Sequence, residues 1–264
     1  MYSERRRVDY TQRQGLDIAL GGGAYKSNGI TSVGMMEAII NIPFDLNIKP
    51  LAKMARLEMG TDDAKEFEAL VDETRRVARP KALYKECFVG KMGKDTVAID
   101  NITFISPTLR MNLDKIGRVF AYVATCGQEI DQIKIPPDNY LKRFWLDTIK
   151  AVLLDFSTGH LRKLFDSKYK LGKTSHMNPG SGDTKVWPIE QQKGLFALFG
   201  DVENLIGVSL TDSCLMIPNK SLSGICFPTE IDFQSCQLCR RENCAGRKAP
   251  FNRKLWQSIH HEKQ

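Results

Sequence analysis

Four of the seven cysteines gather near the end of the chain, in a pattern that suits metal binding. Cys236, Cys239 and Cys244 are spaced Cys-x2-Cys-x4-Cys, and Cys226 precedes them. Thiolates this close can share one ion, and four cysteine ligands suit Zn²⁺ or an iron-sulfur cluster. The spacing therefore predicts a metal site formed by these four residues, with unligated cysteines or a disulfide as the alternative.

The spacing alone does not name the metal. It runs in the reverse order of the plant-type Cys-x4-Cys-x2-Cys pattern and differs from the bacterial ferredoxin pattern. The three remaining cysteines, Cys87, Cys126 and Cys214, lie in apolar stretches with the character of strands. We expect those three to be ordinary buried thiols.

Acidic residues stand on the clearest helix of the sequence, residues 141–166. Asp147 and Asp155 are eight residues apart, which places them about 80° apart around the helix axis. Both can therefore approach the edge of one cleft. The alternative is a salt-bridged helix face, with Arg143 and Lys150 as partners of Asp147 and Arg162 as a partner of Asp155.

A loop dense in Gly, Pro, Ser and Asn follows this helix, with the sequence TSHMNPGSGDTKVWP. Gly180 and Gly182 leave its backbone free to approach a ligand closely. The alternative is a connecting turn whose glycines serve only the geometry of the backbone.

Composition indicates a globular protein, with 42% hydrophobic and 26% charged residues in 264. A net charge of +7 suits an acidic protein partner, and without a recognised binding module it does not predict nucleic-acid binding. No apolar stretch approaches the roughly 18 to 20 residues that cross a bilayer, and the N-terminus lacks a secretory cleavage pattern. We expect a cytoplasmic protein without a membrane partner.

Hydrophobic periodicity predicts a mixture of helices and strands with three segments. Residues 1–45 are expected to be an N-terminal arm with one short strand or helix, residues 46–228 an α+β domain, and residues 229–264 a cysteine-rich segment. The expected elements of the domain are two amphipathic helices in 47–80, a hairpin of 82–90 and 96–106, a buried strand at 119–127, the helix 141–166, a helix at 189–200, and two strands around Pro218 and Asn219.

The order of these pieces resembles the reactivation domain of cobalamin-dependent methionine synthase. The resemblance rests on ARPKALYK before the hairpin, VFAYVATCGQEID, the loop MNPGSGD with the helix WPIEQQKGLF, and IGVSLTDSCLMIPNKSLSG. It implies an α+β fold with a curved antiparallel sheet flanked by helices. It also implies docking on a corrinoid protein or a cobalamin-dependent methyltransferase, where S-adenosylmethionine (AdoMet) supplies a methyl group as an electron arrives.

The same resemblance implies a ligand site made by Asp155 and the loop. Asp155 stands where the family often has a glutamate near the amino group of the ligand, and the loop contributes Pro179, Gly180 and Gly182. The sequence departs from the family at two places, where His176 replaces an arginine and Ser181 replaces a tyrosine. A histidine is mostly neutral at pH 7 and lacks the fixed donor fork with which arginine holds a carboxylate.

The resemblance also bears on the metal, because corrinoid reactivation needs a source of low-potential electrons. A [4Fe-4S] cluster can supply them and zinc cannot. The leading hypothesis is therefore an accessory protein for reductive reactivation of cobalamin with an iron-sulfur cluster at its C-terminal cysteines, belonging to a methyltransferase system. The alternatives are an AdoMet-binding methyl donor site and a zinc-stabilised binding module without a redox role.

Overall fold

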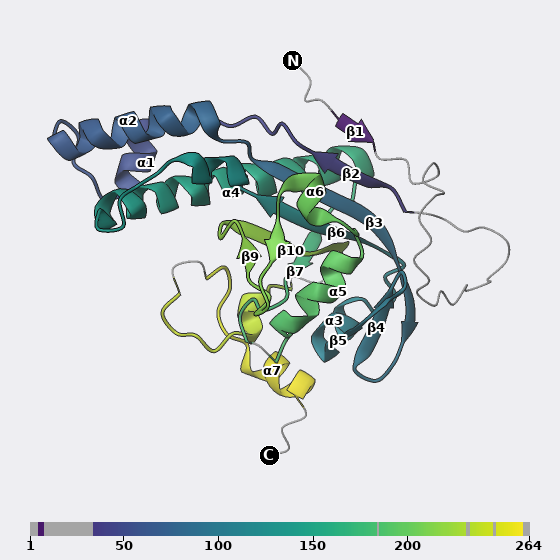
Figure 1. Cartoon of the computed structure of the whole chain (residues 1–264). Helices are drawn as coiled ribbons and strands as arrows, with labels where there is room; N and C mark the ends of the chain where they lie inside the picture. The colour runs from purple at the N-terminus through teal and green to yellow at the C-terminus, as the bar shows by residue number, and fades with distance from the viewer. Residues whose placement is uncertain (1–4, 8–33, 184, 231–232, 245–246, 261–264) are drawn as a thin grey trace.

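The computed structural model describes residues 5–7, 34–183, 185–230, 233–244 and 247–260 (Figure 1). Within them, eight strands form one sheet in the order β1-β2-β3-β6-β10-β7, with β4 pairing with β3 and β5. Every pairing in the sheet is antiparallel. Its strands are β1 (Arg5–Arg7), β2 (Met36–Ile39), β3 (Lys81–Met92), β4 (Thr96–Ile99), β5 (Ile102–Ile105), β6 (Arg118–Thr125), β7 (Thr174–Met177) and β10 (Ser221–Pro228).

Helices cover both faces of this sheet (Figure 1). The predicted α+β class, with a curved antiparallel sheet and flanking helices, is confirmed. The α-helices are α1 (Ile48–Met54), α2 (Asp62–Val77), α3 (Pro107–Asn112), α4 (Tyr140–Tyr169), α5 (Gln192–Ala197), α6 (Val202–Ile206) and α7 (Arg253–His260). The described residues also form short 3₁₀ turns, η2 (Gln128–Gln132), η3 (Ile189–Gln191) and η4 (Ser235–Leu238).

Strand β6 divides the hydrophobic core because almost all its side chains are buried on one face or the other. Phe120 and Tyr122 pack with the C-terminal half of α4. Val119 and Val123 pack into a larger cluster with residues of α5, α6 and α7. The N-terminal half of α4 extends past the sheet and packs on α1 and α2 (Figure 1).

Helix α4 is the longest element and confirms the helix predicted at 141–166. The Asn139 side chain caps its N-terminus by accepting a hydrogen bond from the Lys142 backbone N–H, at 2.9 Å. Lys170 ends the helix in the left-handed region. At 1.5 Å per residue its 30 residues run about 45 Å, which carries one helix from the α1–α2 end to the far side of the sheet.

The predicted hairpin is correct in its first turn and wrong in its second strand. Residues 96–106 do not form one strand, because the chain turns at Asp100 and Asn101 between β4 and β5. Asp100 takes a positive φ of 48°, and its carboxylate accepts a hydrogen bond from the Phe88 backbone N–H. Two-residue turns in β-hairpins often place Asp at a position with a positive φ.

Near the C-terminal end of the domain, Pro218 separates β9 (Met216–Ile217) from β10, as the sequence predicts. However, β9 pairs with β8 (Ser209–Leu210) in a small separate sheet rather than with β10. Within the predicted N-terminal arm, β2 pairs with β3, while the glycine-rich stretch 21–29 lies outside the described residues. The boundary at residue 45 stays a prediction.

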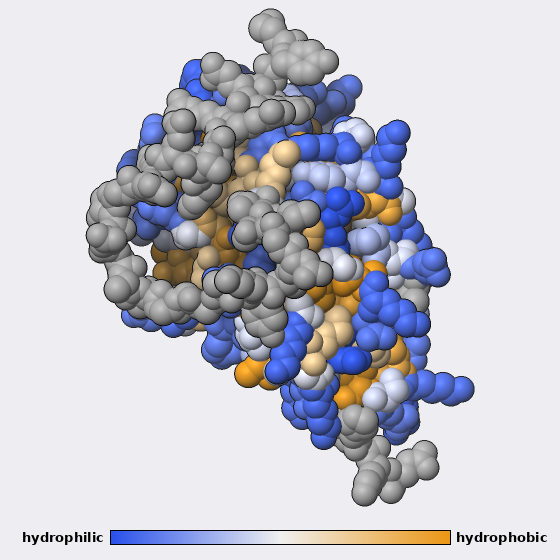
Figure 2. Space-filling model, turned by 90° about the vertical axis from the view of Figure 1, so that its right-hand side faces the viewer, coloured by the Kyte–Doolittle hydropathy of each residue, from blue (hydrophilic) through white to orange (hydrophobic). Residues whose placement is uncertain are grey.

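Hydrophobic residues reach the surface in patches separated by hydrophilic ones on the side shown in Figure 2. Exposed apolar side chains of this kind are ordinary for a folded protein. None of the helices in the described part of the chain is both long and apolar enough to span a membrane.

Candidate functional site

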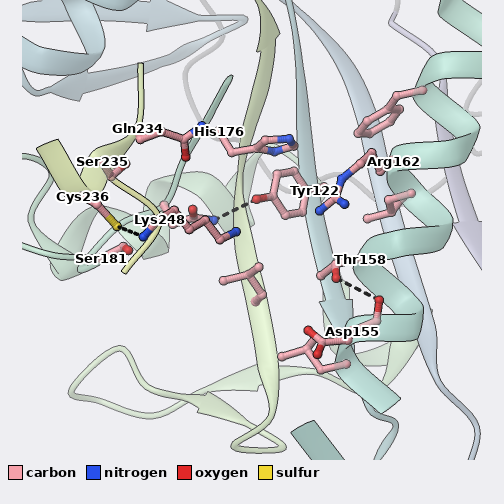
Figure 3. Close-up of a pocket in the computed structure, with 15 residues that line it drawn as sticks. Tyr122, Asp155, Thr158, Arg162, His176, Ser181, Gln234, Ser235, Cys236 and Lys248 are labelled. Carbon is pink, nitrogen blue, oxygen red and sulfur yellow. Dashed lines mark hydrogen bonds between the residues drawn. The ribbon is translucent and has the colours of Figure 1, made fainter. Parts of the chain in front are cut away.

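A cavity of about 310 Å³ opens between α4, the sheet and the C-terminal segment (Figure 3). This volume lies at the lower end of the roughly 300–1,000 Å³ typical of small-molecule sites. Its walls carry both apolar and polar side chains. They are Tyr122, Leu154, Asp155, Thr158, Leu161, Arg162, Phe165, His176, Asn178, Ser181, Leu222, Gln234, Ser235, Cys236 and Lys248.

Helix α4 presents a polar row to this cavity. Asp155, Thr158 and Arg162 are spaced three and four residues apart, so they share one face of the helix. Leu161 and Phe165 beside them are buried against the sheet and fix the rotation of the helix. Because packing holds the helix, the direction of the polar row is set before any ligand arrives.

The sheet contributes a hydrogen-bonded pair at the floor of the cavity. The Asn178 side-chain amide donates to the Tyr122 hydroxyl at 2.9 Å and to the Ser223 backbone carbonyl at 2.6 Å. Gly224 permits this approach, since a Cβ there would lie 2.3 Å from the Asn178 amide nitrogen. Burial raises the pKa of the Tyr122 hydroxyl, which stays protonated at neutral pH.

His176 stands on β7 with its ring edge-on to Tyr122, at 5.8 Å between ring centroids. Burial lowers the pKa of His176 to about 4, and the positive charges of Arg162 and Lys248 act in the same direction. The imidazole is therefore neutral at pH 7. It can donate or accept one hydrogen bond, but it cannot replace a permanent cation.

The remaining wall comes from the C-terminal segment. Gln234, Ser235 and Cys236 lie at η4, and Lys248 follows later in the chain. The segment is held by the Arg247 guanidinium, which donates to the carbonyls of Cys236 at 3.3 Å, Ala249 at 3.2 Å, Cys239 at 3.3 Å and Arg241. Arg240 lies over the Trp256 ring of α7, 3.7 Å from its centroid.

The structure brings together half of the predicted ligand residues. Asp155, His176 and Ser181 line one cavity, although they come from a helix, a strand and a loop. Pro179, Gly180 and Gly182 do not line it. Gly180 and Gly182 take positive φ angles of 73° and 83°, which gives them a role in the shape of the loop.

The two acidic residues predicted to share a cleft do not do so. Asp147 lies outside the cavity, where its carboxylate forms an ion pair with Lys220 at 2.8 Å and accepts a hydrogen bond from Asn219 at 3.2 Å. Asp155 alone faces the cavity. Of the two expected partners of Asp147, Lys150 pairs with Asp131 of η2 instead, and Arg143 donates a hydrogen bond to the Pro137 carbonyl.

The four C-terminal cysteines do not converge in the structure. Among the described residues, no three His, Cys, Asp or Glu side chains form a group that could hold a metal ion. Cys226 is 1% exposed and lies within the sheet, where it stands opposite Phe120 of β6 and His176 of β7. This arrangement does not fit a four-cysteine cluster, and the metal site at Cys226, Cys236, Cys239 and Cys244 stays a prediction.

The other three cysteines follow their prediction. Cys87, Cys126 and Cys214 are buried free thiols. The sequence reasoning missed several polar cavity residues as ligand candidates, among them Tyr122, Arg162, Asn178 and Lys248. The sequence predicts Arg162 as a salt-bridge partner of Asp155, but the described residues show no ion pair between the two.

Comparisons with known proteins agree with this fold. No family model and no curated protein sequence matches the chain. A crystal structure of the MetH reactivation domain bound to AdoHcy matches it with a TM-score of 0.51, over 72% of this chain and 69% of that one. The two share a fold. Because the two sequences are only 16% identical, the similarity shows the fold alone.

Proposed function

We propose that this chain binds AdoMet in the cavity beside α4 and supports the reductive reactivation of cobalamin. The corrin would belong to a partner, either a corrinoid protein or a cobalamin-dependent methyltransferase. One observation carries the proposal. Three residues assigned to a ligand site by resemblance, Asp155, His176 and Ser181, line one cavity on a fold similar to that of a domain crystallised with AdoHcy.

The chemistry of the cavity suits a ligand with polar ends and an apolar middle. Leu154, Leu161 and Leu222 offer surface to a flat or aliphatic group, while Asp155 and Arg162 offer opposite charges. When bound, AdoMet supplies a methyl group that leaves its sulfonium, with a neutral thioether as the other product. The residues of this chain would bind and orient the ligand.

Calorimetry with AdoMet and AdoHcy tests the proposal. We expect binding to the wild type that is lost or strongly weakened in Asp155→Ala, because this carboxylate is the sole acidic side chain among the described residues that line the cavity. Asp147→Ala is a matched control, since it removes a carboxylate from the same helix outside the cavity. Absence of binding in the wild type would contradict the proposal.

The cobalamin role needs its own experiment. The chain is added to a corrinoid protein whose cobalt has been oxidised to cob(II)alamin, with a chemical reductant and AdoMet, and the absorption of methylcobalamin is followed. We expect faster methylcobalamin formation with the wild type than with Asp155→Ala. Equal rates of methylcobalamin formation with the two proteins would show that ligand binding at Asp155 takes no part in cobalamin reactivation.

Metal binding by the C-terminal cysteines stays a prediction from the sequence, because the described residues do not bring three of these thiols together. Cys236, Cys239 and Cys244 are free thiols within one short segment, and the Cys236 sulfur accepts a hydrogen bond from the Lys248 backbone N–H at 3.4 Å. Iron, sulfide and zinc are measured in protein purified without oxygen. Iron with sulfide would support the cluster, one zinc per chain would support the zinc-stabilised module, and a metal-free protein would exclude both.

A further inference from the structure

The two positive side chains that line the cavity stand at the same end of it. Arg162 reaches from α4 toward Tyr122 and His176, and Lys248 comes from the C-terminal segment on the opposite side (Figure 3). Neither forms an ion pair with a carboxylate within the described residues. Their combined field reaches His176, whose pKa both of them lower.

The negative charge of the cavity lies away from this end. Asp155 precedes Arg162 by seven residues on the same face of α4, a rise of about 10 Å along the helix axis. Its carboxylate makes no ion pair within the described residues either. The cavity is therefore polarised along the helix, with an anion at one end and two cations at the other.

The neutral side chains between these two ends also favour a ligand whose negative group lies near Arg162. The Tyr122 hydroxyl accepts its hydrogen bond from Asn178, which leaves its own proton available for a ligand oxygen. His176 is neutral and can add one donor. Hydrogen-bond donors are therefore grouped around Arg162. At this end of the cavity, no carboxylate of the described wall is present to accept their hydrogen bonds.

We propose that Arg162 is the residue that binds the carboxylate of the ligand, with Lys248 on the other side of the same group and an N–H group of the ligand at Asp155. This inference rests on the proposed function and assigns an orientation to the ligand in that site. A guanidinium offers two parallel N–H donors that match the two oxygens of a carboxylate. The cation that His176 does not supply therefore comes from the helix across the cavity.

Calorimetry with three probes tests the assignment. AdoHcy carries a carboxylate, 5′-methylthioadenosine lacks it, and AMP has a phosphate in place of the amino-acid part. The variants are Arg162→Gln, Arg162→Lys and Lys248→Gln. Lys163→Gln is the control, since it removes one positive charge from the neighbouring position on α4, which does not line the cavity.

We expect Arg162→Gln to weaken AdoHcy binding about 10- to 100-fold, the range for a lost hydrogen bond to a charged group. Arg162→Lys keeps the charge without the fork and should fall between the wild type and Arg162→Gln. Binding of 5′-methylthioadenosine should change little in any variant. An NMR titration of His176 shows whether Arg162→Gln is folded. In a folded variant the pKa of His176 should rise from about 4 because a nearby positive charge is lost, yet stay below the 6.5 of an unfolded chain because burial still lowers it.

Three results would overturn the inference. If AdoHcy binds the wild type and Arg162→Gln equally, the carboxylate lies elsewhere and the proposed function survives. If AMP binds more tightly than AdoHcy and Arg162→Gln weakens the binding of AMP, the ligand group that Arg162 binds is a phosphate rather than a carboxylate. If the wild type binds neither AdoMet nor AdoHcy, the proposed function fails and this assignment fails with it.

Discussion

The two sides of the cavity differ in what holds them. On the sheet side, Tyr122, Leu161 and Phe165 are buried, and the ring of Phe165 lies 5.1 Å from that of Phe120. On the C-terminal side, Cys236 and Cys239 are only partly buried, and polar contacts of Arg247 hold the backbone of their segment. Core packing fixes the first wall. The second is anchored by the buried side chains of Leu238 and Trp256 and by the hydrogen bonds of Arg247, while its residues that face the cavity are partly buried or exposed.

This difference separates the roles of the two walls. Residues placed by the packed wall, such as Asp155 and Arg162, are preorganised for a ligand, which lowers the entropic cost of binding. Lys248 and Cys236 belong to the less buried wall, since Lys248 is exposed and Cys236 is only partly buried. That wall can open or rearrange at a smaller cost in free energy than the sheet, because local stability follows the amount of buried contact.

The largest effect is expected from crowding the packed wall at Gly224. In Gly224→Ala the new methyl group would lie 2.3 Å from the Asn178 amide nitrogen and 2.6 Å from the Met177 carbonyl oxygen. Overpacking of this kind costs about 3 kcal/mol of the free energy of unfolding, which urea denaturation can measure. The variant should also lose ligand binding, because Asn178 and Tyr122 must separate.

Gly159 of α4 supplies the matched control. No atom lies within 4 Å of a Cβ built there, and the position is inside a helix. Gly159→Ala should therefore stabilise the protein by about 0.5 to 1 kcal/mol through its helix propensity. A loss of stability in Gly159→Ala comparable to that in Gly224→Ala would show that the packed wall is not specifically sensitive at Gly224.

Acid should weaken the packed wall through His176. Its pKa is about 4 in the folded protein and about 6.5 in an unfolded chain, so the unfolded state binds the proton first. The contribution of neutral His176 is complete above pH 6.5 and is lost as the pH falls toward 4. We expect a loss of about 2 kcal/mol across this window, measured by urea denaturation at pH 7 and pH 4.5.

His176→Gln should remove most of this pH dependence, since glutamine does not titrate. His160→Gln is the comparison, because His160 lies on α4 but does not line the cavity. If the two variants and the wild type lose stability in parallel between pH 7 and pH 4.5, His176 is not the group responsible.

Much of the packed wall could be predicted from the sequence. The apolar periodicity from Leu141 to Phe156 predicts α4, and Trp145, Ile149 and Leu153 of this pattern are buried in the core, although Leu141 is exposed. The turn at Asp100 escaped prediction, since β-branched residues stand on both sides of it and mask the hairpin signal. The local sequence pattern thus predicts helices and strands more readily than the turns that interrupt them.

The site was only half predictable. Asp155, His176 and Ser181 were found by resemblance, while Tyr122 and Lys248 reach the cavity through contacts between segments far apart in the chain. For the cysteines, nearness in sequence did not mean nearness in space. Cys226 follows the register of β10, where it sits opposite Phe120 and His176 in the sheet.

The C-terminal wall should be loosened by Arg247→Ala with little effect on the sheet. The change removes hydrogen bonds to the carbonyls of Cys236 and Cys239 and should lower the local opening free energy by about 1.5 kcal/mol. Hydrogen exchange and the alkylation rate of Cys236 measure this opening. Arg241→Ala, an exposed arginine of the same segment, is the control, and equal alkylation rates in both variants would refute the anchoring role of Arg247.

The smallest effect is expected at the stack of Arg240 on Trp256, which links the cysteine segment to α7. A cation over an indole ring at an exposed site contributes about 0.5 to 1 kcal/mol, so Arg240→Ala should accelerate exchange in α7 only a few fold. Arg240→Lys should restore part of the protection, because the charge returns without the flat guanidinium. If Arg240→Ala instead loosened the C-terminal wall as much as Arg247→Ala does, α7 would share in holding the wall that carries Cys236 and Lys248.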